Sequence, residues 1–215
     1  MITTMSGFLP KDLGQGMLAM FQDMSQSILN QWQNIDEERI RVFKHQNESI
    51  RMGNSDWQVL YAPGHTNTQS CFYNKSTQEL FSADMLLKIT PTPVMEASEI
   101  ETNKRQKSIL TMLDSYAYYR SLPINRVYPG HYEIFDDPID KIDNQLKRID
   151  RRKEECFKLI ENGTDNLLDI FQGLYKGRWH LPAFNMTLAY IDLLEFEGRV
   201  LIKKADGDIL RILPT

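Results

Sequence analysis

The 215-residue sequence lacks the features that mark secreted and membrane-bound proteins. It contains only two cysteines, Cys71 and Cys156, which are too few for a disulfide framework or a thiolate metal site. Its N-terminus has no charged segment followed by an apolar one, and no window approaches 18 uninterrupted apolar residues. We therefore expect a cytoplasmic protein with no membrane partner.

An excess of positive charge is also missing. Lysine and arginine number 25 against 29 aspartates and glutamates, so the formal net charge is −4. Residues 140–215 carry equal numbers of basic and acidic side chains. Because nucleic-acid binding draws its affinity from phosphate neutralisation, we expect no nucleic-acid partner and favour a small-molecule substrate.

Hydrophobic spacing divides the chain into two predicted domains, residues 1–139 and 140–215. Apolar residues every three or four positions predict amphipathic helices over 9–32 and 99–122. A period of two predicts short strands that alternate with turn-rich stretches. These strands are expected over residues 39–43, 49–52, 57–63, 70–73, 79–83 and 124–130.

The second domain has a different pattern. A charged helix from Pro138 is expected to stop at Asn162, Thr164 to cap a second helix, and Pro182 to open a third that ends near Glu197. The segment RVLIKKADGDILRIL then predicts two strands around an Asp-Gly turn. Three helices and a hairpin predict a winged-helix-like unit, but its third helix has acidic residues and no lysine or arginine, which disfavours DNA binding.

Three predicted strands end beside a side chain that can bind a metal. They lie in WQVLYAPGHT, ELFSADMLL and RVYPGHYEIFDDP, and they present His65, Asp84 and His131. A Pro-Gly pair before each histidine predicts a sharp turn that exposes the imidazole at the strand end. Imidazole nitrogens and a carboxylate suit zinc, and also iron or manganese.

In this order, the segments resemble the later half of the metallo-β-lactamase fold hydrolases. The C-terminal DLLEFEGRV resembles a signature of the branch that carries a C-terminal extension, the glyoxalase II and β-lactamase-like branch. The resemblance implies an α+β fold, namely part of an αββα sandwich followed by the winged-helix-like domain. It also implies that His65 binds one ion, that Asp84 bridges two, and that His131 binds the second. Ala83 stands where the family more often has glycine.

The activity implied by this resemblance is hydrolysis of an ester, thioester, amide or phosphoester by a hydroxide bound to two zinc ions. Asp84 is the candidate catalytic residue because it would hold the ions together. Tyr132, next to His131, is a candidate substrate contact, whereas Tyr116, Tyr118 and Tyr119 fit aromatic core packing better.

The family's His-x-His-x-Asp-His segment, which supplies two ligands to each metal, is absent. His45 is the one histidine before PGHT and is expected on a solvent face, and His180 is expected in a loop or in the core. The helix over 9–32 resembles the lid that follows the missing segment. We therefore expect a truncated chain with an incomplete metal site.

An alternative function is a non-catalytic scaffold or protein-interaction module built on the same fold. Loss of the early half would expose sheet edge and apolar surface, which a homodimer or the missing N-terminal segment would cover. Met17, Met20 and Met24 form an adaptable apolar stripe for such contacts.

Overall fold

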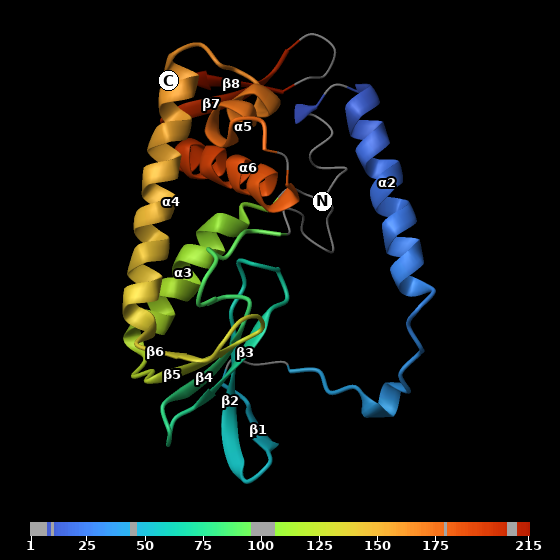
Figure 1. Ribbon diagram of the computed structural model, residues 1–215, viewed down its shortest axis with the longest axis vertical. Coiled ribbons are helices and arrows are strands. Elements are labelled where there is room, and N and C mark those ends of the chain that lie inside the picture. The colour runs from blue at the N-terminus through green and yellow to red at the C-terminus, as the bar shows by residue number, and fades with distance from the viewer. Residues whose placement is uncertain (1–7, 10, 44–46, 96–105, 179, 206–209) are drawn as a thin grey trace.

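The computed structural model describes residues 8–9, 11–43, 47–95, 106–178, 180–205 and 210–215, and His45 lies outside these ranges. Helices and strands are mixed, so the expected α+β class is confirmed (Figure 1). In chain order the elements are α2 (Lys11–Leu29), η2 (Glu37–Arg39), β1 (Ser49–Met52), β2 (Ser55–Tyr61), β3 (Ser70–Asn74), β4 (Glu79–Ala83), α3 (Ser108–Ser121), β5 (Arg126–Pro129), β6 (Phe135–Asp136), α4 (Pro138–Glu161), α5 (Leu167–Tyr175), α6 (Leu181–Phe196), β7 (Val200–Lys204) and β8 (Leu210–Pro214).

Six strands form one mixed sheet in the order β1-β2-β3-β4-β5-β6. The first four pair antiparallel, β4 and β5 pair parallel through the crossover that contains α3, and β6 returns antiparallel to β5. Strands β2, β4 and β5 therefore run in the same direction, and their carboxyl ends lie at the same edge of the sheet. The loops that carry His65, Asp84 and His131 follow these three ends.

Alternation along the strands decides which side chains enter the core. Leu60, Leu80 and Val127 are fully buried together with Ile109 and Met112 of α3. The other face of the sheet carries a row of aromatic rings in which Phe81 lies 4.7 Å from Trp57 and 4.9 Å from Tyr128, measured between ring centroids. Phe81 keeps 39% of its surface exposed, so this second face is partly open to solvent.

Residues after β6 form three helices and a hairpin, as the sequence predicted. Strands β7 and β8 make a separate two-stranded sheet and do not join the main one. Arg199, just before β7, donates both terminal nitrogens to Glu154 of α4 and lies 3.9 Å from the Phe157 ring, which fixes the hairpin against α4. The buried core is continuous from the sheet to these helices, and the boundary near residue 139 stays a prediction.

Helix α4 runs along one side of the molecule, from the level of β7 and β8 to that of β5 and β6 (Figure 1). It begins at Pro138 beside the main sheet and packs against α3, α5, α6 and β8. Its apolar positions, among them Ile142, Ile149 and Ile160, face the core. One rigid element thus joins the two parts of the chain.

Two local predictions from the sequence are wrong. Residues 39–43 form no strand, because Ile40 and Val42 are exposed and no strand pairs with them among the described residues. The N-cap of α5 is Asn166, whose side-chain oxygen accepts from the backbone N–H of Asp169 at 3.0 Å, and Thr164 lies two residues outside it. Apolar alternation forms no strand without a strand to pair with, and α5 begins two residues later than a cap at Thr164 requires.

Helix α2 confirms the helical part of the segment expected over 9–32. It lies on the opposite side of the molecule from α4 (Figure 1). Several of its large apolar side chains, and those that follow it, are exposed: Leu13, Met20, Met24, Ile28, Leu29 and Trp32. The side chain of Met17 is outside what the structure describes. Nor does any helix of the described residues combine the length and apolarity needed to cross a membrane.

Candidate metal centre and cavity

The turn after β2 places His65 at the sheet edge. Gly64 has φ +146°, and its Cα faces α3 so closely that a Cβ would lie 2.6 Å from Met112 Cα. The hydroxyl of Ser115 donates to Pro63 O at 2.8 Å and ties the same turn to α3. The glycine is required here for both its backbone conformation and its lack of a side chain.

The turn after β4 places Asp84 beside the turn after β5. Ala83 has φ +45°, a left-handed conformation that is strained for any residue with a Cβ. The N–H of Gly130 donates to Ala83 O at 2.8 Å, which pairs the two turns. A Cβ on Gly130 would lie 2.5 Å from Asp84 Oδ1, so the glycine leaves room for the carboxylate.

Substitution of Ala83 by glycine is expected to stabilise the protein. Glycine adopts φ +45° without steric cost, so Ala83→Gly should raise the free energy of unfolding by about 1 kcal/mol. Urea denaturation followed by circular dichroism measures the change. The matched control is Ala117→Gly at an exposed position inside α3, which should lower stability by about 1 kcal/mol. A less stable Ala83→Gly protein would contradict the strain assigned to this turn.

The three sequence-predicted side chains come together. Asp84 Oδ2 lies 3.5 Å from His65 Nε2 and 3.6 Å from His131 Nε2. His65 is mostly buried at 15% side-chain exposure, whereas His131 is 69% exposed. The carboxylate thus sits between two imidazoles, one inside the cavity wall and one at its mouth.

The hydrogen bond made by His65 Nδ1 leaves Nε2 available to a cation. Pro93 O lies 2.8 Å from His65 Nδ1, so Nδ1 carries the proton and donates to this carbonyl. In the neutral ring, the Nε2 lone pair then faces the Asp84 carboxylate. The other carboxylate oxygen, Oδ1, is buried and has no hydrogen-bond partner among the described residues. Two facing acceptors and an unpartnered oxygen suit a bound cation.

The donor set fits part of a two-metal site. Two ligands about 2.0 Å from a tetrahedral zinc ion are roughly 3.3 Å apart, slightly less than both nitrogen–oxygen separations around Asp84. The described residues nevertheless contain no group of three or more His, Cys, Asp or Glu side chains arranged to hold an ion. Each ion would have one histidine and a shared carboxylate.

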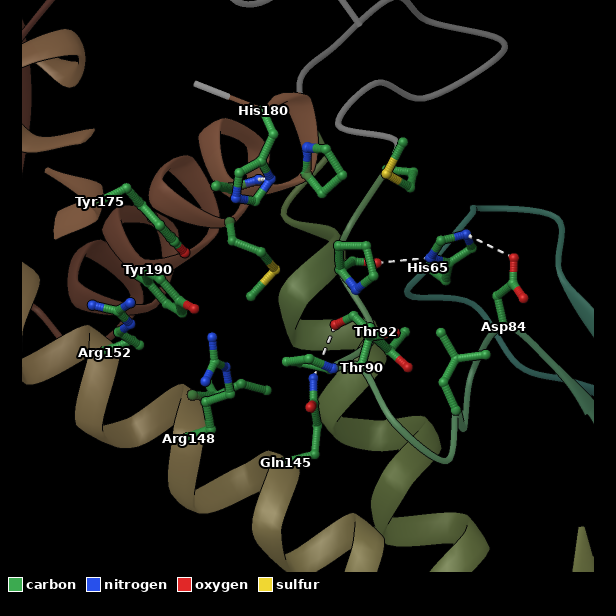
Figure 2. Close-up of a pocket in the computed structure, with 18 of the residues that line it drawn as sticks. His65, Asp84, Thr90, Thr92, Gln145, Arg148, Arg152, Tyr175, His180 and Tyr190 are labelled. Carbon is green, nitrogen blue, oxygen red and sulfur yellow. Dashed lines mark hydrogen bonds and ion pairs between the residues drawn. The ribbon is translucent and has the colours of Figure 1, made fainter. Parts of the chain in front are cut away.

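A cavity of about 960 Å³ extends from these residues toward the C-terminal helices (Figure 2). His65, Asp84 and His131 line one end of it. Tyr132, the predicted substrate contact, also lines it and is 51% exposed. Its role in substrate binding stays a prediction.

Other aromatic and sulfur side chains belong to the core. Tyr116 and Tyr119 are fully buried, which confirms their packing role. Both cysteines are free and buried. Burial raises the pKa of the Cys71 thiol to about 11 and that of Cys156 to about 12, so neither is a thiolate nucleophile near neutral pH.

The far wall of the cavity was not predicted from the sequence. Its side chains come from α4, from the end of α5, from α6 and from the loop between α5 and α6: Gln145, Arg148, Arg152, Tyr175, Lys176, Arg178, His180 and Tyr190. His180, expected in a loop or the core, caps α6, since its Nδ1 accepts from Ala183 N–H at 3.2 Å. The missed signal was the spacing of residues 145, 148 and 152, which places their side chains on one helix face.

Comparison with known proteins gives no matching family model. The "Beta-lactamase-like protein 2 homolog" of Drosophila melanogaster is 25% identical over 177 residues, which cover 79% of this chain and 56% of the fly protein. The Caenorhabditis elegans protein of the same name is 21% identical over 119 residues, which cover 55% of this chain and 36% of the worm protein. The chain therefore spans about half or less of the length of these curated relatives.

Two crystal structures share the fold. A metallo-β-lactamase family protein from Thermus thermophilus aligns with a TM-score of 0.70 and 18% identity, over 92% of this chain and 65% of that one. A β-lactamase domain protein from Burkholderia ambifaria aligns with a TM-score of 0.70 and 19% identity, over 81% of this chain and 53% of that one.

Proposed function

Since the chain belongs to the metallo-β-lactamase superfamily, we propose that it takes part in metal-dependent hydrolysis of an ester, thioester, amide or phosphoester. The observation that carries this proposal is the position of Asp84 Oδ2 between the Nε2 atoms of His65 and His131. We place the activity in the cytoplasm, where two free, buried cysteines stay reduced.

In this proposal His65 and Asp84 hold one ion, and His131 and Asp84 hold the second. Zinc suits these ligands, and iron or manganese would also suit them. Bound ions would supply a water of lowered pKa and a polarised scissile bond. The protein itself orients the donors: Pro93 O fixes the His65 ring, and Gly130 leaves room for the Asp84 carboxylate.

The experiment is a zinc titration by calorimetry, with elemental analysis and assays on bis(4-nitrophenyl) phosphate and a thioester. A catalytic zinc usually has three protein ligands, so the chain should bind zinc weakly and reversibly and hydrolyse little. Asp84→Asn and His65→Ala should each lower the zinc affinity at least tenfold. The control Asp56→Asn removes an exposed carboxylate at the start of β2 and should bind zinc like the wild type.

Equal zinc affinity in the wild type and in Asp84→Asn would contradict the proposed site. Stoichiometric binding of two ions with robust, His65-dependent turnover would instead show that further ligands complete the site. That result would overturn the incomplete-site argument and support the hydrolase.

The exposed apolar side chains of α2 favour a second candidate, a non-catalytic interaction module. Met20 is 56% exposed, Met24 48% and Leu29 60%, and a second copy or a further segment of a longer protein would cover them. Sedimentation velocity of the wild type and of Met24→Glu separates the two functions. A dimer that dissociates in Met24→Glu, without zinc binding by the wild type, would favour the module.

A further inference from the structure

The end of the cavity far from Asp84 is lined by cations and hydrogen-bond donors. Arg148 and Arg152 reach into it from α4, toward Tyr190 of α6 (Figure 2). Lys176 and Arg178 contribute further positive charge from the loop between α5 and α6. Among the described lining residues, Asp84 at the opposite end is the one carboxylate.

The two arginines of α4 differ in how far they are already engaged. Arg152 donates to Glu155 at 2.7 Å and to Leu174 O at 3.1 Å, and its guanidinium lies over the Tyr175 ring. Its Nε is buried and has no hydrogen-bond partner in the described part of the chain. Arg148 is half-buried and forms no ion pair with any carboxylate of the described residues. A guanidinium in a concave wall with no counterion favours an anion that enters the cavity.

Neutral groups around the arginines also donate. Burial raises the pKa of Tyr190, and a hydrogen bond with Tyr175 also raises it, whereas the charges of Arg148 and Arg152 lower it. His180 Nδ1 accepts from the backbone, so in the neutral ring Nε2 carries the proton and donates. Donors therefore converge on this end, where Glu155 already pairs with Arg152 and no described carboxylate pairs with Arg148.

From this arrangement we propose that the substrate is a small organic anion, with a phosphate or carboxylate group bound by Arg148 and Arg152 at a distance from the bond cleaved beside Asp84. That the bound anion is a substrate rests on the proposed hydrolytic function. The anion subsite itself is argued from the contacts of Arg148 and Arg152 alone. A cavity of about 960 Å³ is the size of a small-ligand pocket. Bidentate pairing with a guanidinium suits both anion types.

Calorimetry with phenyl phosphate tests the subsite, in buffer that contains EDTA so that no metal contributes. The wild type should bind phenyl phosphate, with an affinity that falls as salt rises, and should not bind phenol. Arg148→Ala should weaken binding at least tenfold, and Arg148→Glu should abolish it. Benzoate, run in parallel, distinguishes a phosphate subsite from a carboxylate one.

Three controls keep the outcome clear. Arg151→Ala removes the same charge from an exposed position on the same helix and should bind like the wild type. Asp84→Asn should bind phenyl phosphate no more weakly than the wild type, which separates this subsite from the metal centre. Thermal unfolding of Arg148→Ala should match the wild type, since this side chain has no structural ion pair to lose among the described residues.

Binding of phenyl phosphate by Arg148→Ala as tightly as by the wild type would overturn the inference, as would no binding of either anion by the wild type. Failure to bind zinc would count against the proposed hydrolysis but would not change the EDTA result. The two proposals can therefore fail separately.

Discussion

Gly64→Ala should lower the free energy of unfolding by roughly 3 kcal/mol, the largest stability change expected from a single methyl group in this chain. The added Cβ would lie 2.6 Å from both Cα and Cβ of Met112, and Met112 is fully buried in α3. Because backbone atoms are involved, rotation of a flexible side chain cannot relieve the clash. The left-handed φ of +146° adds strain. Urea denaturation measures the loss.

Gly53→Ala is the control, because it also has a positive φ but does not have the clash. Gly53 has φ +61° in the turn between β1 and β2, and no atom of the described residues lies within 4 Å of its added Cβ. This variant should lose only about 1 kcal/mol. If both variants lost the same amount, the close approach of the His65 turn to α3 would not contribute to stability.

Gly130→Ala should reduce zinc affinity at least tenfold while the fold remains intact. Its φ lies outside the left-handed region, so backbone strain is not the cause. The new Cβ would lie 2.5 Å from Asp84 Oδ1 and 3.2 Å from the Ala83 carbonyl carbon, and the carboxylate must move away. A displaced carboxylate loses its position between His65 and His131. Zinc titration by calorimetry measures the effect, and thermal unfolding should change by only a few degrees.

The corresponding control is Gly16→Ala in α2, where no atom that the structure describes lies within 4 Å of the added Cβ. It should leave zinc affinity unchanged and slightly stabilise the helix. Zinc affinity in Gly130→Ala equal to that of the wild type would show that the Asp84 carboxylate is not the group that binds the ion.

Convergence of His65, Asp84 and His131 could be expected from the sequence because the site depends on strand direction. A ligand that directly follows a hydrophobic strand needs only a parallel arrangement of strands to meet its partners at one edge. Turn residues such as Gly64 and Gly130 were visible in the same motifs. Their second function, which is to make room for Met112 and for Asp84, could not be predicted because it depends on atoms distant in sequence.

The proposed anion subsite could not be predicted from the sequence in the same way. Arg148 and Arg152 lie in a helix rich in charge of both signs, where a solvent-facing role is the usual one. Only the packing of α4 against α6 turns that part of the helix inward, next to Tyr190. Residues 39–43 are the opposite case: their alternation predicted a strand, but no described strand pairs with them.

Helix α4 also sets the distance between the two ends of the cavity. Gln145 donates to Thr92 O at 2.9 Å and so anchors the helix to the loop that follows Asp84, while Arg152 lies seven residues further along. At 1.5 Å per residue, that interval is about 10 Å of helix axis. In the proposed complex, this length of α4 would set the distance between the cleaved bond and the anionic group of the substrate. One residue inserted after Gln145 would turn both guanidinium groups by roughly 100° about the helix axis and take them out of the cavity.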